Sequence, residues 1–153
     1  MQIAARVPRN ILRRVRVAAL LGACATSFIG CASAPPPPSV LPTRFASIPT
    51  RIVPSMGMHI VELQCPTPGY QATLTRSLDE HMGKGVYITI RQPDPGVNYA
   101  QRLVTQQVAT DVPTTLTLNV YARLLPYDAP ADSDEPFSIA GSEKGSIPIP
   151  TPP

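Results

Sequence analysis

Apolar and polar residues alternate along several short stretches in the middle of the chain. In the clearest of them, Val86, Ile88 and Ile90 are separated by more polar residues. A period of two is typical of a β-strand that buries one face. Four other stretches follow this pattern in whole or in part: residues 58–65, 70–78, 101–110 and 115–125. Val104 and Val108 are spaced for either a helix or one strand face, so the assignment of residues 101–110 stays open.

Turn-forming residues separate these stretches. Prolines and glycines that interrupt a strand or permit a tight turn occur in residues 66–69, 83–85, 92–96 and 111–113. Five short strands joined in this way favour an all-β domain over residues 56–126, either a small antiparallel β-sandwich or a partly open barrel. In the last strand, five residues are expected to point inward: Leu116, Leu118, Val120, Ala122 and Leu124.

Residues 1–30 have the layout of a bacterial export signal. Basic residues without any acidic residue precede position 17, and residues 17–30 carry no charge and are largely apolar. This run is shorter than the roughly 20 residues that a membrane-spanning helix needs. A signal peptide is therefore favoured over a transmembrane segment.

The tetrapeptide FIGC, which ends at Cys31, resembles the lipobox of bacterial lipoproteins. The resemblance implies that Cys31 carries a diacylglycerol, that a peptidase cuts before it, and that its new amino terminus receives a fatty acid such as palmitate. Cys24 ends a second candidate, LGAC, but it would leave an apolar run of only about seven residues. Ala32, where an inner-membrane lipoprotein would carry Asp, implies an outer-membrane lipoprotein that faces the periplasm or the cell surface.

Prolines crowd both ends of the part that follows the signal. Residues 31–55 contain four consecutive prolines and several more, and predict an extended Pro-rich tether. Residues 127–153 combine prolines with acidic residues and predict a disordered tail. A second interpretation lets Phe137, Ser138 and Ile139 join the sheet as an edge strand.

The charge of the chain bears on its expected partners, and its cysteine content bears on its disulfides. The whole chain has a formal charge of +3, but from Cys31 onward there are eight Lys and Arg against ten Asp and Glu, a balance of −2. The basic character therefore belongs to the signal, and nucleic acid is not an expected partner. If Cys31 is acylated, Cys65 remains a free thiol; if Cys24 is acylated, a Cys31–Cys65 disulfide becomes available.

No catalytic or metal-binding pattern stands out. His59 and His81 lack the spacing of a metal motif, and Cys65 falls on the apolar face of its strand, which indicates a core residue. We therefore expect a protein that is not an enzyme and that holds no metal or cofactor.

The order of features between Met58 and Tyr121 resembles the small β domain of the PrcB-type protease-complex lipoproteins. Residues 67–70 (TPGY) correspond to a T-G-G-Y turn, residues 93–96 (PDPG) to a P-x-P-G-like loop, and residues 100–101 to an Ala-Gln pair. The sequence departs from the family at Pro68, where a glycine is usual, and at residues 106–107, where the family usually has proline. The resemblance implies a small β domain that binds or stabilises a partner protease.

Four residues are candidates for a partner-binding face. Tyr87, Arg91, Tyr121 and Arg123 fall on the outward parity of their strands, and tyrosine and arginine are common at protein interfaces. We call them the Tyr/Arg face. The sequence thus predicts a lipid-anchored envelope protein that acts as a protein-interaction module, with a protease as one partner. The alternative is a structural component of an envelope or secretion assembly.

Overall fold

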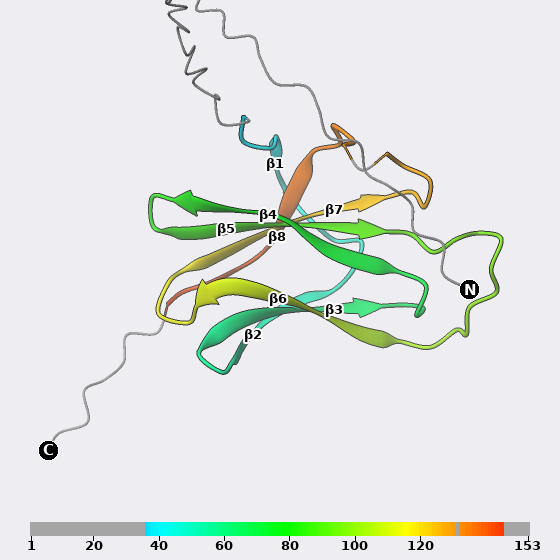
Figure 1. Cartoon of the computed structure of the whole chain (residues 1–153), viewed down its shortest axis with the longest axis horizontal. Helices are drawn as coiled ribbons and strands as arrows, with labels where there is room; N and C mark the ends of the chain where they lie inside the picture. The colour runs from blue at the N-terminus through cyan, green and yellow to red at the C-terminus, as the bar shows by residue number, and fades with distance from the viewer. Residues whose placement is uncertain (1–35, 131, 146–153) are drawn as a thin grey trace, which may run out of the picture. The chain divides into compact units, whose positions relative to one another are not determined.

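The computed structural model describes residues 36–130 and 132–145, and within them it contains strands and no helix (Figure 1). No helix in these ranges is long and apolar enough to cross a membrane. The predicted export signal, with Cys24 and Cys31, lies outside the described residues. The eight strands are β1 Val40–Arg44, β2 Thr50–Ser55, β3 Met58–Cys65, β4 Gln71–Glu80, β5 Gly83–Arg91, β6 Val104–Pro113, β7 Leu118–Leu125 and β8 Phe137–Glu143.

The strands form two sheets that are not closed into a barrel, which confirms the predicted all-β class. One sheet has five strands in the order β1-β8-β7-β5-β4, and the other has three in the order β2-β3-β6. Figure 1 shows β2, β3 and β6 as a separate layer beneath the larger sheet. Of the segment 101–110, whose assignment was open, residues 104–110 belong to strand β6 and residues 101–103 to the loop before it.

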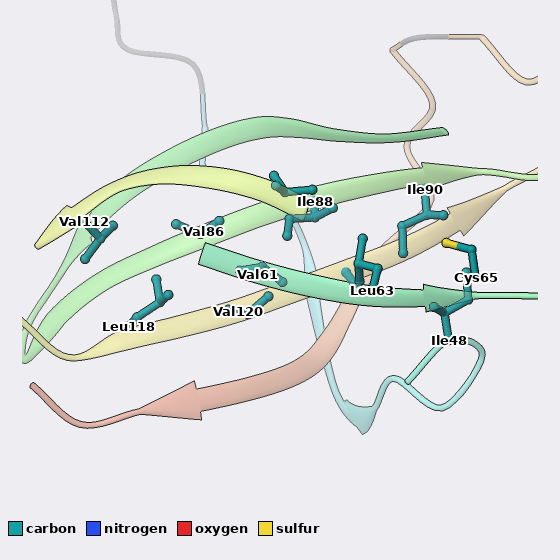
Figure 2. Packing of buried hydrophobic residues seen from close by; sticks show 12 residues of the cluster. Ile48, Val61, Leu63, Cys65, Val86, Ile88, Ile90, Val112, Leu118 and Val120 are labelled. Carbon is teal, nitrogen blue, oxygen red and sulfur yellow. The ribbon is translucent and has the colours of Figure 1, made fainter. Parts of the chain in front are cut away.

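The core lies between the two sheets and follows the alternation of the sequence. Figure 2 shows the side chains of β3 directed toward those of β5 and β7. The fully buried residues of the core include Val61, Leu63, Cys65, Val86, Ile88, Ile90, Leu118 and Val120. Burying such aliphatic side chains contributes roughly 1.5–3 kcal/mol each. Leu116 does not join them, because it lies in the turn between β6 and β7 and is 41% exposed.

The five-stranded sheet is mixed, which the prediction of an antiparallel fold did not include. β5 pairs with β7 in parallel, and β1 pairs with β8 in parallel, whereas the other pairs are antiparallel. β6 lies between β5 and β7 in the chain but belongs to the other sheet. The chain therefore returns to β7 in the same direction as β5.

The prediction of a tether over residues 31–55 is wrong for its described part. Residues 40–44 and 50–55 form β1 and β2, and Ile48 between them is 2% exposed in the core. Both strands lie at sheet edges. Pro42 and Pro54 are tolerated there, because an edge strand leaves one row of N–H groups unpaired.

The prediction of a disordered tail over residues 127–153 is also wrong for residues 137–143, which form β8. The second interpretation, that Phe137, Ser138 and Ile139 join the sheet, is confirmed, but β8 is not an edge strand, because it pairs with β7 on one side and with β1 on the other. Phe137 is 3% exposed, which explains why the strand stays in place despite the prolines and acidic residues before it. Residues 146–153 lie outside the described residues.

Two of the predicted turns, residues 83–85 and 111–113, belong to strands in the structure. Residues 111–113 continue β6 rather than ending it, and Val112 is fully buried. Residues 83–85 belong to β5, so the hairpin between β4 and β5 turns at His81 and Met82.

Candidate functional site

The Tyr/Arg face exists, but the protein's own chain covers much of it. Tyr87 and Tyr121 lie opposite each other on β5 and β7, and their rings stack with centroids 4.9 Å apart. The ring of Phe137, at the start of β8, meets Tyr87 edge-on at 5.2 Å. Tyr87 is 5% exposed and Arg123 is 7% exposed. The expectation that these two side chains face solvent is therefore wrong.

The two arginines of this face bind backbone carbonyl groups of the β7–β8 connection. Arg123 donates from Nε to Thr89 Oγ1 at 3.0 Å and from Nη1 to the carbonyl oxygens of Ser133 and Glu135, the latter at 3.0 Å. Its guanidinium also lies over the Phe137 ring, 4.5 Å from the centroid. Burial lowers the pKa of Arg123. These contacts fasten residues 133–137 over the sheet.

Arg91 makes similar contacts with the first part of the β7–β8 connection, residues 127–129. Its Nη1 donates to the carbonyl oxygens of Tyr127 at 3.3 Å and Ala129 at 2.6 Å. With Arg91 and Arg123 committed in this way, the Tyr/Arg face is a structural element rather than an open surface. Sequence parity placed the residues correctly and missed the segment that covers them.

Tyr121 is held by polar groups at the edge of this cluster. Burial, a hydrogen bond to Glu80 and the charge of Glu80 together raise the pKa of Tyr121 to about 12. Glu80 also accepts a hydrogen bond from Asn119 Nδ2 at 2.7 Å, and Asn119 Oδ1 in turn accepts one from Ser142. The network links β4, β7 and β8.

A different part of the molecule offers an open site. The turn between β3 and β4, residues 66–70, packs against the loop between β5 and β6, residues 92–103. Together they form a cleft of about 360 Å³. We call it the loop cleft. It is lined by Thr67, Tyr70, Gln92, Pro93, Asp94, Pro95, Val97, Asn98, Tyr99 and Gln101.

Gly69 allows the two segments to meet. A Cβ at this position would lie 2.7 Å from Pro93 Cβ and 2.7 Å from two ring atoms of Tyr99. These distances are shorter than van der Waals contact, so only glycine lets the Tyr99 ring rest against the turn. The close approach therefore sets the position of one wall of the cleft.

Hydrogen bonds between side chains and backbone, together with one backbone–backbone bond, hold the walls in place. Gln106, on β6, accepts from the Ala72 N–H at 3.2 Å and donates to the Tyr70 carbonyl, which ties the end of the turn to the second sheet. In the facing loop, Asp94 accepts from the Gly96 N–H at 2.8 Å. The loop begins where the Gln92 N–H donates to the Leu125 carbonyl at 2.9 Å. The cleft is thus formed before any partner arrives.

Thr67 gives the cleft an unsatisfied polar group. Its side chain is 8% exposed, and its buried hydroxyl has no hydrogen-bond partner among the residues that the structure describes. Buried hydroxyl groups are normally paired, and an unpaired one costs about 1–3 kcal/mol. A bound molecule or water that reached this hydroxyl would recover that free energy.

The two histidines and Cys65 differ in their surroundings. His59 is buried, and its Nε2 lies 3.1 Å from the Leu116 carbonyl, while His81 is exposed in the β4–β5 turn. Cys65 is a buried free thiol whose pKa is raised by burial, as its place on the apolar face indicated. Within residues 36–130 and 132–145, no three His, Cys, Asp or Glu side chains gather where they would hold a metal ion.

The sequence alone did not predict the loop cleft as a site, although it did single out the two segments that form it. Residues 67–70 and 93–96 were interpreted as turns and as matches to family motifs, and the structure places the two beside each other. Half-buried tyrosines at positions 70 and 99, in loops rather than strands, were the available signal. Comparisons with family models, with curated proteins and with solved structures found no match to this chain.

Proposed function

We propose that this chain is a lipid-anchored protein-interaction module of the bacterial outer membrane, and that it binds its partner through the loop cleft. The observation that carries the proposal is the packing of two loops through Gly69, which builds a cleft with two half-buried tyrosines. Loops held at one end of a rigid β-sandwich are common binding surfaces.

The chemistry of the loop cleft suits a protein partner. Tyrosines supply broad apolar contact with a hydroxyl at the rim, and the amides of Gln92, Asn98 and Gln101 supply adaptable hydrogen bonds. Val97 beside them is 49% exposed, and Leu103 at the end of the loop is 77% exposed. Exposed apolar side chains next to tyrosines are typical of an interface core.

The proposed partner is an envelope protease. The support is the resemblance to the PrcB-type lipoproteins, whose matching segments at residues 67–70 and 93–96 are the two that meet at the cleft. The proposal assigns no catalytic residue to this chain. The partner's active site, rather than this domain, would carry the chemistry.

Lipid attachment at Cys31 would keep the domain close to the membrane. Arg76 donates to the carbonyl of Pro36 at 2.9 Å, so the chain is already fastened to the domain at that residue. From Cys31 to Pro36 the chain spans at most about 17 Å. A Cys31→Ser variant is expected to lose incorporated fatty-acid label, whereas Cys24→Ser is expected to keep it. Label retained in Cys31→Ser would reject this anchor.

The binding proposal is tested by capture from detergent-solubilised envelopes after mild crosslinking. Tyr99→Ala removes one wall of the cleft, and Met82→Ala changes a residue that is 79% exposed in the β4–β5 turn. We expect wild type and Met82→Ala to capture a protease in simple stoichiometry, and Tyr99→Ala to lose at least tenfold of it. Equal capture by all three proteins would overturn the cleft as the binding site. A large multi-component particle would instead indicate a structural envelope component.

A further inference from the structure

The loop cleft is almost free of charge. Among its lining residues only Asp94 carries one, and an oxygen of that carboxylate already accepts a hydrogen bond from the Gly96 N–H. What remains is a surface of tyrosine, proline and side-chain amides. The complementary ligand is therefore uncharged, apolar in part, and rich in hydrogen-bond acceptors.

A proline-rich segment has these properties. An extended polyproline helix makes no internal hydrogen bonds, so its carbonyl oxygens are free to accept from side-chain donors. Grooves lined by aromatic residues recognise such segments because the helix is formed beforehand and loses little entropy on binding. The domain already binds one proline carbonyl in this way, since Arg76 donates to that of Pro36.

The chain itself contains a matching ligand. Residues 146–153 read SIPIPTPP, with four prolines, two isoleucines and no charged side chain. We propose that this segment of one copy binds in the loop cleft of a second copy. The inference rests on the proposed function of the cleft as a binding site, and it identifies one occupant of it.

The strand topology places the occupant in a second molecule rather than the same one. β8 ends beside the start of β7, where Glu143 pairs with Leu118, whereas the loop cleft begins beside the end of β7, where Gln92 bonds to Leu125. The seven residue steps of β7 between them span about 23 Å. A Cβ on Gly145 would lie against Thr115 and Leu116, which precede β7, so residues 146–153 begin at least this far from the cleft. Fully extended, these eight residues reach about 25 Å. Residues 146–153 would lie along this whole distance, so these eight residues do not also fill the cleft of their own molecule.

Site-specific photocrosslinking in intact envelopes tests the inference on the full chain. A benzoylphenylalanine replaces Val97 at the cleft or, as a control, Met82 in the β4–β5 turn; both positions are exposed. Trypsin cleaves after Lys144, so the proposed ligand is released within the peptide 145–153. Two differently tagged copies expressed together identify crosslinks between molecules.

We expect a crosslinked dimer from position 97 that maps to peptide 145–153 and joins the two tags, and at least a tenfold weaker dimer from position 82. Replacing Pro148, Pro150 and Pro152 with glycine is expected to remove the dimer. A position-97 adduct on a different protein, without the homodimer, would overturn this inference and leave the proposed function in place. No specific adduct from position 97 would overturn both.

Discussion

Replacing Gly69 with alanine tests how the loop cleft is built. The added Cβ would lie 2.7 Å from Pro93 Cβ and from Tyr99 Cε2 and Cζ. Carbon atoms prefer about 3.5–4.0 Å, so the turn and the loop would have to separate by about 1 Å. The close contact comes from two different groups, one of them a rigid pyrrolidine ring. Rotation of a single side chain therefore does not relieve it.

The expected cost follows from this geometry. Overpacking of this kind destabilises by about 1–3 kcal/mol, and the lower chain entropy of unfolded alanine offsets about 0.4–1 kcal/mol of it. We expect Gly69→Ala to lower the free energy of unfolding by about 1–2 kcal/mol. We also expect it to weaken partner capture, because the Tyr99 ring is displaced.

Gly96→Ala is the matched control, since it makes the same chemical change in the facing loop. Its added Cβ would meet only Asp94 Oδ1, at 3.2 Å. The carboxylate can turn away, so the change in unfolding free energy should stay within about 0.5 kcal/mol. Urea denaturation followed by circular dichroism measures both variants. Equal stability of the two, with unchanged Tyr99 resonances in Gly69→Ala, would refute the account of the cleft.

Three further predictions concern the covered face and the core. Arg123→Met removes the bonds to Thr89 and to two backbone carbonyls, so it should cost about 2–4 kcal/mol in urea unfolding, and Arg91→Met should cost less than half of that; the reverse order would show that Arg123 does not fasten the connection. The pKa of Tyr121 is raised to about 12, so its contribution to stability is present below about pH 10 and is lost as the pH rises toward 12. Unfolding midpoints at about pH 9 and about pH 11 should therefore differ less in Tyr121→Phe than in wild type, and an equal difference would contradict the cause given for the shift. Cys65 is buried with a raised pKa, so peptide mapping should show its alkylation to be on the order of a hundredfold slower in the folded protein than in urea, and similar rates would place the thiol at the surface.

The parity of apolar residues predicted the core because the apolar face of each inner strand is directed at the other sheet. Val61 and Leu63 on β3, and Val86, Ile88 and Ile90 on β5, are enclosed as the alternation indicated. The local alternation of side chains is enough to predict which residues of such a strand face the other sheet.

The prolines were misinterpreted because their effect depends on whether the strand that contains them lies at a sheet edge. Pro42 and Pro54 were interpreted as part of a tether, yet each lies in an edge strand, where the missing N–H is not needed. Whether a strand is at an edge is a property of the whole sheet. The sequence of residues 31–55 alone therefore does not show that its strands lie at sheet edges.

The Tyr/Arg face shows the same limit for a site. Its residues share a face, as predicted, but the segment that covers Tyr87 and Arg123 comes from residues 133–137, beyond the last predicted strand. Phe137 follows a run of acidic residues and prolines, which by composition resembles a disordered tail. Its burial depends on a ring contact and on the Arg123 guanidinium, neither of which a local pattern reveals.

The central claim is that a partner binds at the loop cleft and that the Tyr/Arg face is closed by the protein's own chain. Hydrogen exchange, compared between the free protein and the complex captured from envelopes, tests this directly. We expect slower exchange in residues 67–70 and 92–103 of the complex, with exchange in residues 133–139 unchanged. Protection of residues 133–139 with no change in residues 92–103 would contradict it.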